Sequence, residues 1–356
     1  MTKISIFRLA ISFFITLSLA ITTYSTEAKN LPLADTSNLL EFTIDEGSWV
    51  SVSLHPSNEY FLFDLLGDIY SLPISGGSAE RITSGMAFDS QAVISPSGEK
   101  IAFISDRNGR NNLWIADIDG SNPLKLSDET YARMLSPVWT IDSNSVMVTE
   151  RGNEIELKQY HLDGGSGTTL SQADDDNSNP PGVGAAFSPD GNSVYFAEKL
   201  GSPDAPTEDF PVTQIVRLNL NDGSRLQITR GEGGAVRPKV SPDGKILIYG
   251  TRYQTQTGLR VRDLETGEDR WLSYPIQRDA QENFRLSNNS RGMLPDYAIT
   301  ADSEFLILST GGQFQRIDIA SGARTEIPFT ADISLNIGPD LTNTWRVPTG
   351  PLTATL

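Results

Sequence analysis

The chain of 356 residues has no cysteine and only two histidines, His55 and His161. The absence of cysteine excludes disulfides, thiolate metal sites and cysteine nucleophiles. The two histidines lie far apart and form no His-x-His or His-Glu-x-x-His pattern, which a hydrolytic zinc site would need. We therefore predict no metal site, no cofactor and a structural role for His55.

Other catalytic patterns are also missing from the sequence. There is no Gly-x-Ser-x-Gly elbow for a serine nucleophile, and no glycine-rich phosphate loop precedes a helix. The run from Asp174 to Asn177 offers oxygen atoms to calcium, but it lacks the spacing of an EF-hand loop, so a solvated acidic loop is the better interpretation. We predict no catalytic residue in this chain.

Positive charge is scarce as well, because 28 basic residues face 45 acidic ones and the net charge is −17. A run of phosphates would find few partners on such a chain, so nucleic acids and anionic membrane surfaces are poor candidates for binding. The acidity favours solubility and the attraction of cationic partners, and it carries no information about the fold.

Long apolar runs are confined to the N-terminus. Leu9 to Ile21 is apolar, follows Lys3 and Arg8, and precedes small residues spaced like a cleavage site. This pattern predicts a secretory signal peptide over residues 1–28, with an uncleaved membrane anchor as the alternative. No later stretch is long enough to cross a bilayer, so we expect a periplasmic or secreted protein without a membrane span after signal removal.

What the sequence does contain is a repeated turn. Ser-Pro-Asp-Gly occurs intact twice and in altered form four more times, starting at His55, Ser95, Thr140, Ser188, Ser241 and Thr300. Period-2 apolar segments follow each copy, as in Lys100–Ser105 and Asn112–Asp117. A unit of about 40 residues with strand patterning is typical of propeller blades.

We therefore predict an all-β, six-bladed β-propeller, with two or three strands recognisable in each unit and a blade count that could differ by one. The predicted boundaries are a signal peptide over 1–28, a linker over 29–38, the propeller over 39–335 and an extended tail over 336–356, which could begin a truncated further blade. Leu39–Ile44 alternates and is expected to close the ring by completing the blade built from residues 299–327.

The turns themselves are expected to be folding devices. Proline cannot donate to a strand ladder, aspartate accepts local backbone hydrogen bonds, and glycine takes the left-handed conformation. Candidate binding residues lie instead where the repeat pattern is broken and in long insertions at 171–186, 200–212 and 274–298, since loops on a rigid scaffold usually carry binding. The candidate binding surface comprises Asp68, Asp89, Gln91, Arg107, Arg278 and Arg285. The alternative for Asp89 and Arg107 is an ion pair between blades.

Longer strings add a resemblance to a known family. Residues 63–77, 81–91, 294–298 and 326–332 resemble the propeller of bacterial exported amidohydrolase-related proteins with TolB-like, WD40-like (PD40) repeats, over roughly residues 40–356. The resemblance implies a propeller followed by a metal-dependent hydrolase barrel. No position of this chain matches the metal-binding residues of that barrel, so zinc or another divalent metal is expected only if a missing hydrolase domain exists.

The predicted function is that of an exported propeller that acts as a binding scaffold in the periplasm, with a protein or small ligand at one rim and no catalytic site. The alternative is the N-terminal propeller of a metal-dependent amidohydrolase whose barrel is missing from this chain. A third reading is a fragment without function. The sequence names neither the ligand, the partner nor the oligomeric state.

Overall fold

The computed structural model describes residues 38–128, 133–152, 155–172, 181–199, 213–278 and 294–337. All regular secondary structure in these ranges is β-strand, so the predicted all-β class is confirmed. No helix in the described ranges is long and apolar enough to cross a membrane. The predicted signal peptide, most of the predicted linker and residues 338–356 of the tail lie outside the described residues.

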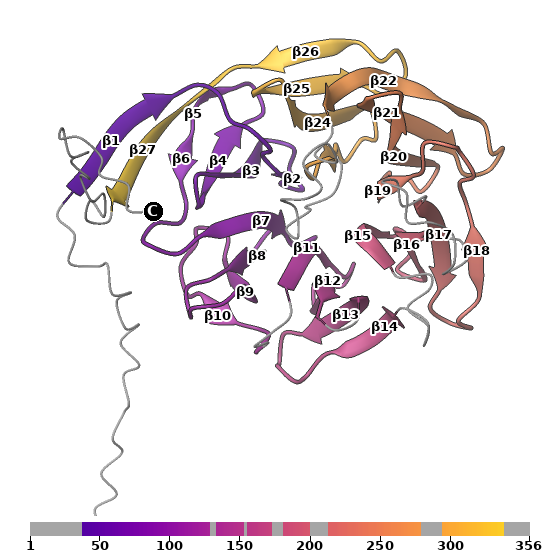
Figure 1. The fold of residues 1–356 in the computed structure, drawn as a ribbon, viewed down its shortest axis with the longest axis horizontal. Coiled ribbons are helices and arrows are strands. Elements are labelled where there is room, and N and C mark those ends of the chain that lie inside the picture. The colour runs from indigo at the N-terminus through magenta and orange to yellow at the C-terminus, as the bar shows by residue number, and fades with distance from the viewer. Residues whose placement is uncertain are drawn as a thin grey trace, which may run out of the picture.

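The described strands form six four-stranded antiparallel sheets, arranged in a circle in Figure 1. The first contains β2 (Val52–Leu54), β3 (Tyr60–Leu65), β4 (Asp68–Pro73) and β6 (Glu80–Arg81). The second contains β7 (Asp89–Ile94), β8 (Lys100–Ser105), β9 (Asn112–Asp117) and β10 (Leu124–Lys125). The third contains β11 (Arg133–Trp139), β12 (Ser145–Arg151), β13 (Ile155–His161) and β14 (Thr168–Gln172).

The other three sheets follow in chain order. The fourth contains β15 (Pro181–Phe187), β16 (Ser193–Lys199), β17 (Thr213–Asn219) and β18 (Arg225–Gln227). The fifth contains β19 (Val236–Val240), β20 (Ile246–Tyr253), β21 (Gln256–Asp263) and β22 (Asp269–Arg278). The sixth contains β23 (Ala298–Ile299), β24 (Phe305–Thr310), β25 (Gln313–Asp318) and β26 (Arg324–Ile327).

The repeated turn joins the first and second strand of every sheet, as its composition predicts. The fourth turn residue has a positive φ in all six copies, at Asn58, Gly98, Ser143, Gly191, Gly244 and Ser303. In the first of the two intact copies, Ser188 Oγ donates to Asp190 Oδ1 at 2.5 Å and Asn192 N donates to the same oxygen at 3.0 Å. Asparagine or serine replaces glycine in three of the four altered copies, and asparagine tolerates this conformation well.

The alternation of Trp49–Leu54 correctly indicated the strand that begins the first sheet, whereas the first strands of the other five sheets were not recognised from the sequence. Two predicted insertions are partly strand: β15 occupies the end of 171–186, and β22 and β23 extend into 274–298. The reason is a β-bulge in β7, β11, β15 and β19, where the register shifts and the apolar alternation breaks. The remaining insertion, 200–212, lies outside the described residues.

A separate hydrophobic cluster fills each interface between neighbouring sheets. Between the second and third sheets, for example, Ile104 and Leu113 pack with Trp139 and Val148. The interface between the sixth and first sheets is filled in the same way, where Ile307 and Phe314 share a cluster with residues of β3 and β4. A single four-stranded sheet exposes two apolar faces, so packing side by side is what buries them.

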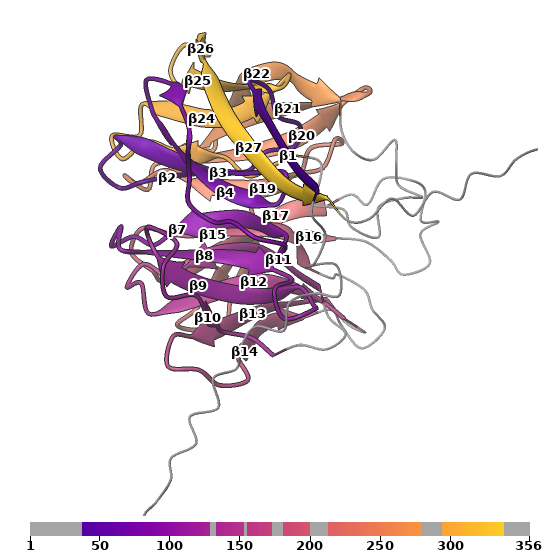
Figure 2. The ribbon, with the colours of Figure 1, turned by 90° about the vertical axis from the view of Figure 1, so that its left-hand side faces the viewer.

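The prediction that Leu39–Ile44 completes the blade built from residues 299–327 is wrong. This segment is β1 (Asn38–Ile44), and it pairs antiparallel with β27 (Phe329–Ile337) rather than with the sixth sheet. β27 also pairs in parallel with β5 (Gly77–Ser78), which gives a three-stranded sheet in the order β1-β27-β5. β1 and β27 form a ribbon outside the first sheet (Figures 1 and 2). Alternation identifies a strand, whereas its partner depends on the whole fold.

The turn aspartates give a testable pH dependence. Hydrogen bonds from Ser188 and from the backbone and side chain of Asn192 lower the pKa of Asp190 to about 2, and equivalent bonds lower the pKa values of Asp142, Asp243 and Asp302. A depressed folded-state pKa stabilises the fold above the unfolded value of about 4 and loses that contribution as the pH falls towards 2. Replacing all four aspartates by asparagine should therefore lower the urea midpoint at pH 5 and much less at pH 2.

The matched control replaces four exposed glutamates by glutamine, at Glu41, Glu46, Glu265 and Glu326. It removes the same number of charges without touching the turns. A difference between wild type and the turn variant that stays constant from pH 5 to pH 2, or that the control reproduces, contradicts this account of the turns.

Candidate functional site

The structure places three of the six predicted site residues in buried positions around the first two sheets. Asp68 opens β4, is 3% exposed and pairs with Arg81 of β6 at 2.6 Å. Burial raises the pKa of Asp68 to about 6, although the Arg81 guanidinium acts in the opposite direction. The ion pair ties β4 to β6 within one sheet.

Asp89 and Arg107 form the ion pair considered in the sequence analysis, at 2.7 Å, but within the second sheet rather than between sheets. Asp89 is 1% exposed, and the Arg107 guanidinium lies 4.9 Å from the Phe103 ring centroid and 5.1 Å from that of Trp114. These contacts hold the pair in place. A direct binding role for Asp68, Asp89 and Arg107 stays a prediction.

Of the other three predicted site residues, the structure describes the side chain of Gln91 but not those of Arg278 and Arg285. Gln91 is buried in β7. Arg278 ends β22, with its side chain outside the description, and Arg285 lies outside the described residues. In the described part of the chain, no three or more histidine, aspartate or glutamate side chains are grouped so as to hold a metal ion.

One sequence position, four residues before each repeat turn, brings six buried residues together at the axis. They are Ser51, Gln91, Ser136, Gly184, Arg237 and Asp296, which we call the hub. Four of them have a positive φ, at Gln91, Ser136, Gly184 and Arg237. Such a backbone turns the peptide groups away from the strand ladder and towards neighbouring sheets.

Hydrogen bonds link the hub from sheet to sheet. The Asp64 carboxylate accepts from Ser51 N at 2.7 Å and from Gln91 N at 3.3 Å, which joins the first and second sheets. Gln91 Oε1 accepts from Ser136 N of the third sheet at 3.0 Å. Across the junction of the first and last sheets, Val52 N donates to the Asp296 carbonyl oxygen at 3.0 Å. These bonds satisfy polar groups that burial would otherwise penalise.

Arg237 spans the centre of the hub. Its side chain is 3% exposed, donates from Nε to the Leu294 carbonyl oxygen and from Nη1 to Ser136 Oγ at 3.2 Å, and lies 3.9 Å from the Asp296 carboxylate. A Cβ on Gly184 would come within 2.9 Å of the Arg237 side chain, so glycine leaves room for it. The arginine thus connects the third, fifth and last sheets.

The repeat turns form an apolar opening around the axis, which we call the mouth. Its lining includes the second turn residue of every repeat, at Pro56, Pro96, Ile141, Pro189, Pro242 and Ala301. All six are exposed, and the cavity measures about 400 Å³. Proline has a fixed φ and little conformational entropy to lose, so the mouth is a rigid apolar surface.

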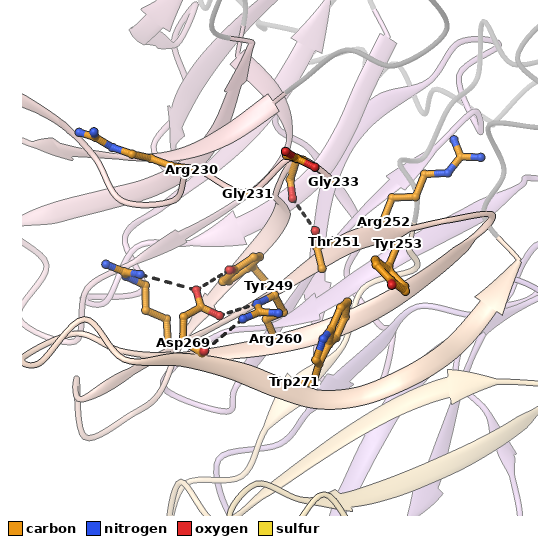
Figure 3. A pocket seen from close by; sticks show the side chains of 13 residues that line it. Arg230, Gly231, Gly233, Tyr249, Thr251, Arg252, Tyr253, Arg260, Asp269 and Trp271 are labelled. Atoms are coloured by element: carbon orange, nitrogen blue, oxygen red, sulfur yellow. Dashed lines mark hydrogen bonds and ion pairs between the residues drawn. The ribbon is translucent and has the colours of Figure 1, made fainter.

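A second cavity of about 430 Å³ lies on the fifth sheet and shares no lining residue with the mouth. Figure 3 shows the side chains that line it. Its floor is Asp269 of β22, which accepts from Tyr249 Oη and pairs with Arg260, both at 2.5 Å. Trp271 and Tyr253 form its wall, and Arg230, Glu232 and Arg252 also line it. Burial and the hydrogen bond to Asp269 raise the pKa of the Tyr249 hydroxyl, so Tyr249 is a hydrogen-bond donor here.

Apart from Gln91 of the hub, the residues of the hub, the mouth and this cleft were not predicted from the sequence. The hub and the mouth do carry a signal, since each is one position of the repeat read in six copies. The cleft carries none, because Tyr253 and Trp271 lie 18 positions apart and meet only through the register that pairs Arg260 with Trp271.

The comparisons with known proteins agree with this architecture. Residues 64–205 match the family model described as the TolB beta propeller domain (PD40). The chain is 28% identical over 286 residues to tricorn protease homolog 1 of Streptomyces coelicolor, covering 79% of this chain. It is 27% identical over 189 residues to the Tol-Pal system protein TolB of Francisella tularensis, covering 51% of this chain.

Among solved structures, TolB from Acinetobacter baumannii superposes with a TM-score of 0.59 at 16% identity, over 80% of this chain and 65% of that one. This likeness shows the fold. The chain spans 24% of the tricorn protease homologue and 39% of Francisella TolB, well under two thirds of either relative. The likeness to PD40, TolB-like propeller repeats is thus shown for residues 64–205.

The hub predicts a large effect for one substitution. Arg237→Met should lower the free energy of unfolding by about 3–5 kcal/mol, the usual cost of removing one partner from a buried charged network. The reason is that the Leu294 carbonyl oxygen and Ser136 Oγ would each lose a buried donor. The Asp296 carboxylate would also lose one neighbouring cation, although Lys239 lies 3.0 Å from it. Urea denaturation of the two proteins measures the difference.

Arg230→Met is the control, because Arg230 is exposed and lies seven residues away in the same segment. Its effect should stay within about 0.5 kcal/mol, as for most surface substitutions. An Arg237→Met protein as stable as the control protein would show that the hub does not hold the sheets together.

Proposed function

We propose that this chain, which carries TolB-like propeller repeats, is an exported scaffold that binds a protein partner at the mouth and has no catalytic residue of its own. The observation that carries the proposal is the convergence of six repeat turns on one apolar opening, with Pro56, Pro96, Ile141, Pro189, Pro242 and Ala301 in its lining. Exposed apolar surface gathered at one place on a soluble scaffold is typical of an interaction site.

The blade count belongs to the same proposal. We infer that the six four-stranded sheets are the blades of one closed propeller and that the β1-β27-β5 sheet is an outer strap rather than a seventh blade. Three cross-turn contacts support closure: Ala301 N donates to Asn58 Oδ1 at 3.1 Å, Ser97 N to Ser143 Oγ at 3.1 Å and Asp243 N to Ser303 Oγ at 3.3 Å. The first of these joins the last turn to the first.

The charge around the mouth indicates what kind of partner would fit. The third residue of four turns is an aspartate, and local hydrogen bonds lower the pKa of each, so the rim is negative at neutral pH. An apolar centre inside an acidic rim suits an apolar segment flanked by basic residues. Such complementarity steers association and selects partners by charge.

Export and a periplasmic location rest on the predicted signal peptide over residues 1–28. They are consistent with the similarity to a protein named as part of the Tol-Pal system. The second candidate function is the accessory propeller of a larger hydrolase, which the small share of the tricorn protease homologue that this chain covers would allow. Its amidohydrolase form, with zinc in a missing barrel, stays a prediction.

The proposal is tested by crosslinking from the mouth. A photo-crosslinking amino acid at Ile141, which is 44% exposed in the mouth, should capture a defined protein in cells that produce the exported chain. The captured protein, once purified, should bind the wild-type chain and bind Ile141→Glu at least about tenfold more weakly, which corresponds to about 1.4 kcal/mol.

The matched control is Leu226, which is 52% exposed on β18 at the outer edge of the fourth sheet. A crosslinker there should not capture the same protein, and Leu226→Glu should leave its affinity unchanged. Equal capture from both positions, or equal affinity of both glutamate variants, contradicts binding at the mouth.

A further inference from the structure

The cleft on the fifth sheet has the parts of a ligand site that the scaffold does not need. We propose that it binds an acidic sugar, with the sugar ring stacked on Trp271 and its carboxylate held by the arginines of the cleft. This inference is independent of the proposed partner at the mouth, because the two cavities share no lining residue.

Three exposed aromatic side chains give the cleft a shaped apolar surface. Tyr253, Trp271 and Tyr274 are 53%, 39% and 37% exposed and touch one another, with ring centroids 5.2–6.0 Å apart. Three large aromatic side chains grouped on the surface form an apolar patch, whereas an isolated one would need no explanation. The Tyr253 and Trp271 rings meet at 68°, so the wall that they form has a corner.

Two residues of β21 orient the indole ring of Trp271. A Cβ on Gly258 would come within 2.6 Å of the Trp271 ring, and the Arg260 guanidinium lies 4.9 Å from the ring centroid. Gly258 and Arg260 are two residues apart on β21 and therefore share a face of the sheet. The indole lies against both residues, and Trp271 remains 39% exposed. Glycine at 258 lets the ring lie flat, and the cation–π contact fixes it.

The lining of the cleft carries a net positive charge. Arg230, Arg252, Arg260 and Arg262 line the cleft together with two acids, Glu232 and Asp269. The lining thus has two more positive than negative charges, in a chain whose net charge is −17. Asp269 is shared by Arg260 and by Arg262, which lies 3.6 Å away, so one carboxylate serves two guanidinium groups. An anionic ligand would complete their pairing.

The combination of an aromatic face and guanidinium groups indicates the class of ligand. A flat apolar face beside guanidinium groups fits a molecule with an apolar ring face and a carboxylate, and a uronic acid has both. The cavity of about 430 Å³ holds one or two sugar rings, whereas an extended peptide would need a longer groove. The hydroxyl groups of a sugar would also find Tyr249 and Thr251 among the lining residues.

The experiment is calorimetric titration of the mature full chain with trigalacturonate, with maltotriose as the neutral sugar and tetraglutamate as the acidic peptide. We expect saturable binding of trigalacturonate alone, which weakens as salt is raised. Trp271→Ala and Arg262→Gln should each raise the dissociation constant about tenfold or more, equivalent to about 1.4 kcal/mol. Tyr253→Ala, at the exposed end of its hairpin, provides a second wall variant if Trp271→Ala does not fold.

Two controls make the outcome specific. Arg316→Gln removes an arginine that lies 4.3 Å from the Phe305 ring on the sixth sheet, which is the same kind of pair outside the cleft, and it should bind trigalacturonate like wild type. Ile141→Glu in the mouth should also bind normally, so failure at one cavity is distinguishable from failure at the other. Absence of saturable binding at millimolar trigalacturonate, equal binding of tetraglutamate, or unchanged affinity in both wall variants would overturn the proposal.

Discussion

The arrangement of the six sheets in a circle depends on the packing of the last sheet against the first. Each of the six four-stranded sheets is built from one continuous stretch of chain, so strands from both ends meet in the outer β1-β27-β5 sheet and in none of these six. Besides two backbone hydrogen bonds, from Gly47 N and Val52 N, the junction relies on side chains. Its aromatic residues Phe61, Phe63, Phe314 and Phe329 pack with ring centroids 4.9–6.3 Å apart. The ribbon of β1 and β27 adds Ala331 and Ile333 to the same cluster. Aromatic packing of this kind contributes beyond its buried area, and here it takes the place of shared ladder hydrogen bonds.

The buried hub holds the sheets together, whereas the mouth and the cleft are surfaces available for binding. At the axis, the hub satisfies its polar groups across sheets, and Arg237 joins sheets that are not neighbours in sequence. A satisfied polar network of this kind specifies one arrangement of the sheets, because any other arrangement leaves buried groups without partners. Around it, the turns hold apolar residues at the mouth and the fifth sheet holds an aromatic cleft. Rigid support beneath both surfaces lowers the entropic cost of binding there.

The repeat turn was enough to predict the all-β class and the position of most strands, because its φ requirements and local hydrogen bonds are short-range. The inner strands were harder to recognise, since a bulge at Gln91, Ser136, Gly184 or Arg237 interrupts the alternation by which a strand is identified. The partner of β1 and the contact between Tyr253 and Trp271 depend on long-range register, which a single sequence does not display. The candidate site residues were chosen as departures from the repeat, and the structure places Asp68 and Asp89 in buried ion pairs instead of on an open surface.

Native-state hydrogen exchange at the closing junction tests this account most directly. Gly47 N donates to the Gly312 carbonyl oxygen and Val52 N to that of Asp296, and both bonds cross the junction, whereas Ser136 N donates to Gln91 between two sheets that follow each other in the chain. If the circle is closed as described, the amides of Gly47, Val52 and Ser136 should exchange with the same free energy, that of global unfolding. Exchange of Gly47 and Val52 that is about a hundredfold or more faster than that of Ser136, equivalent to about 2.7 kcal/mol, would show that the circle opens at this junction.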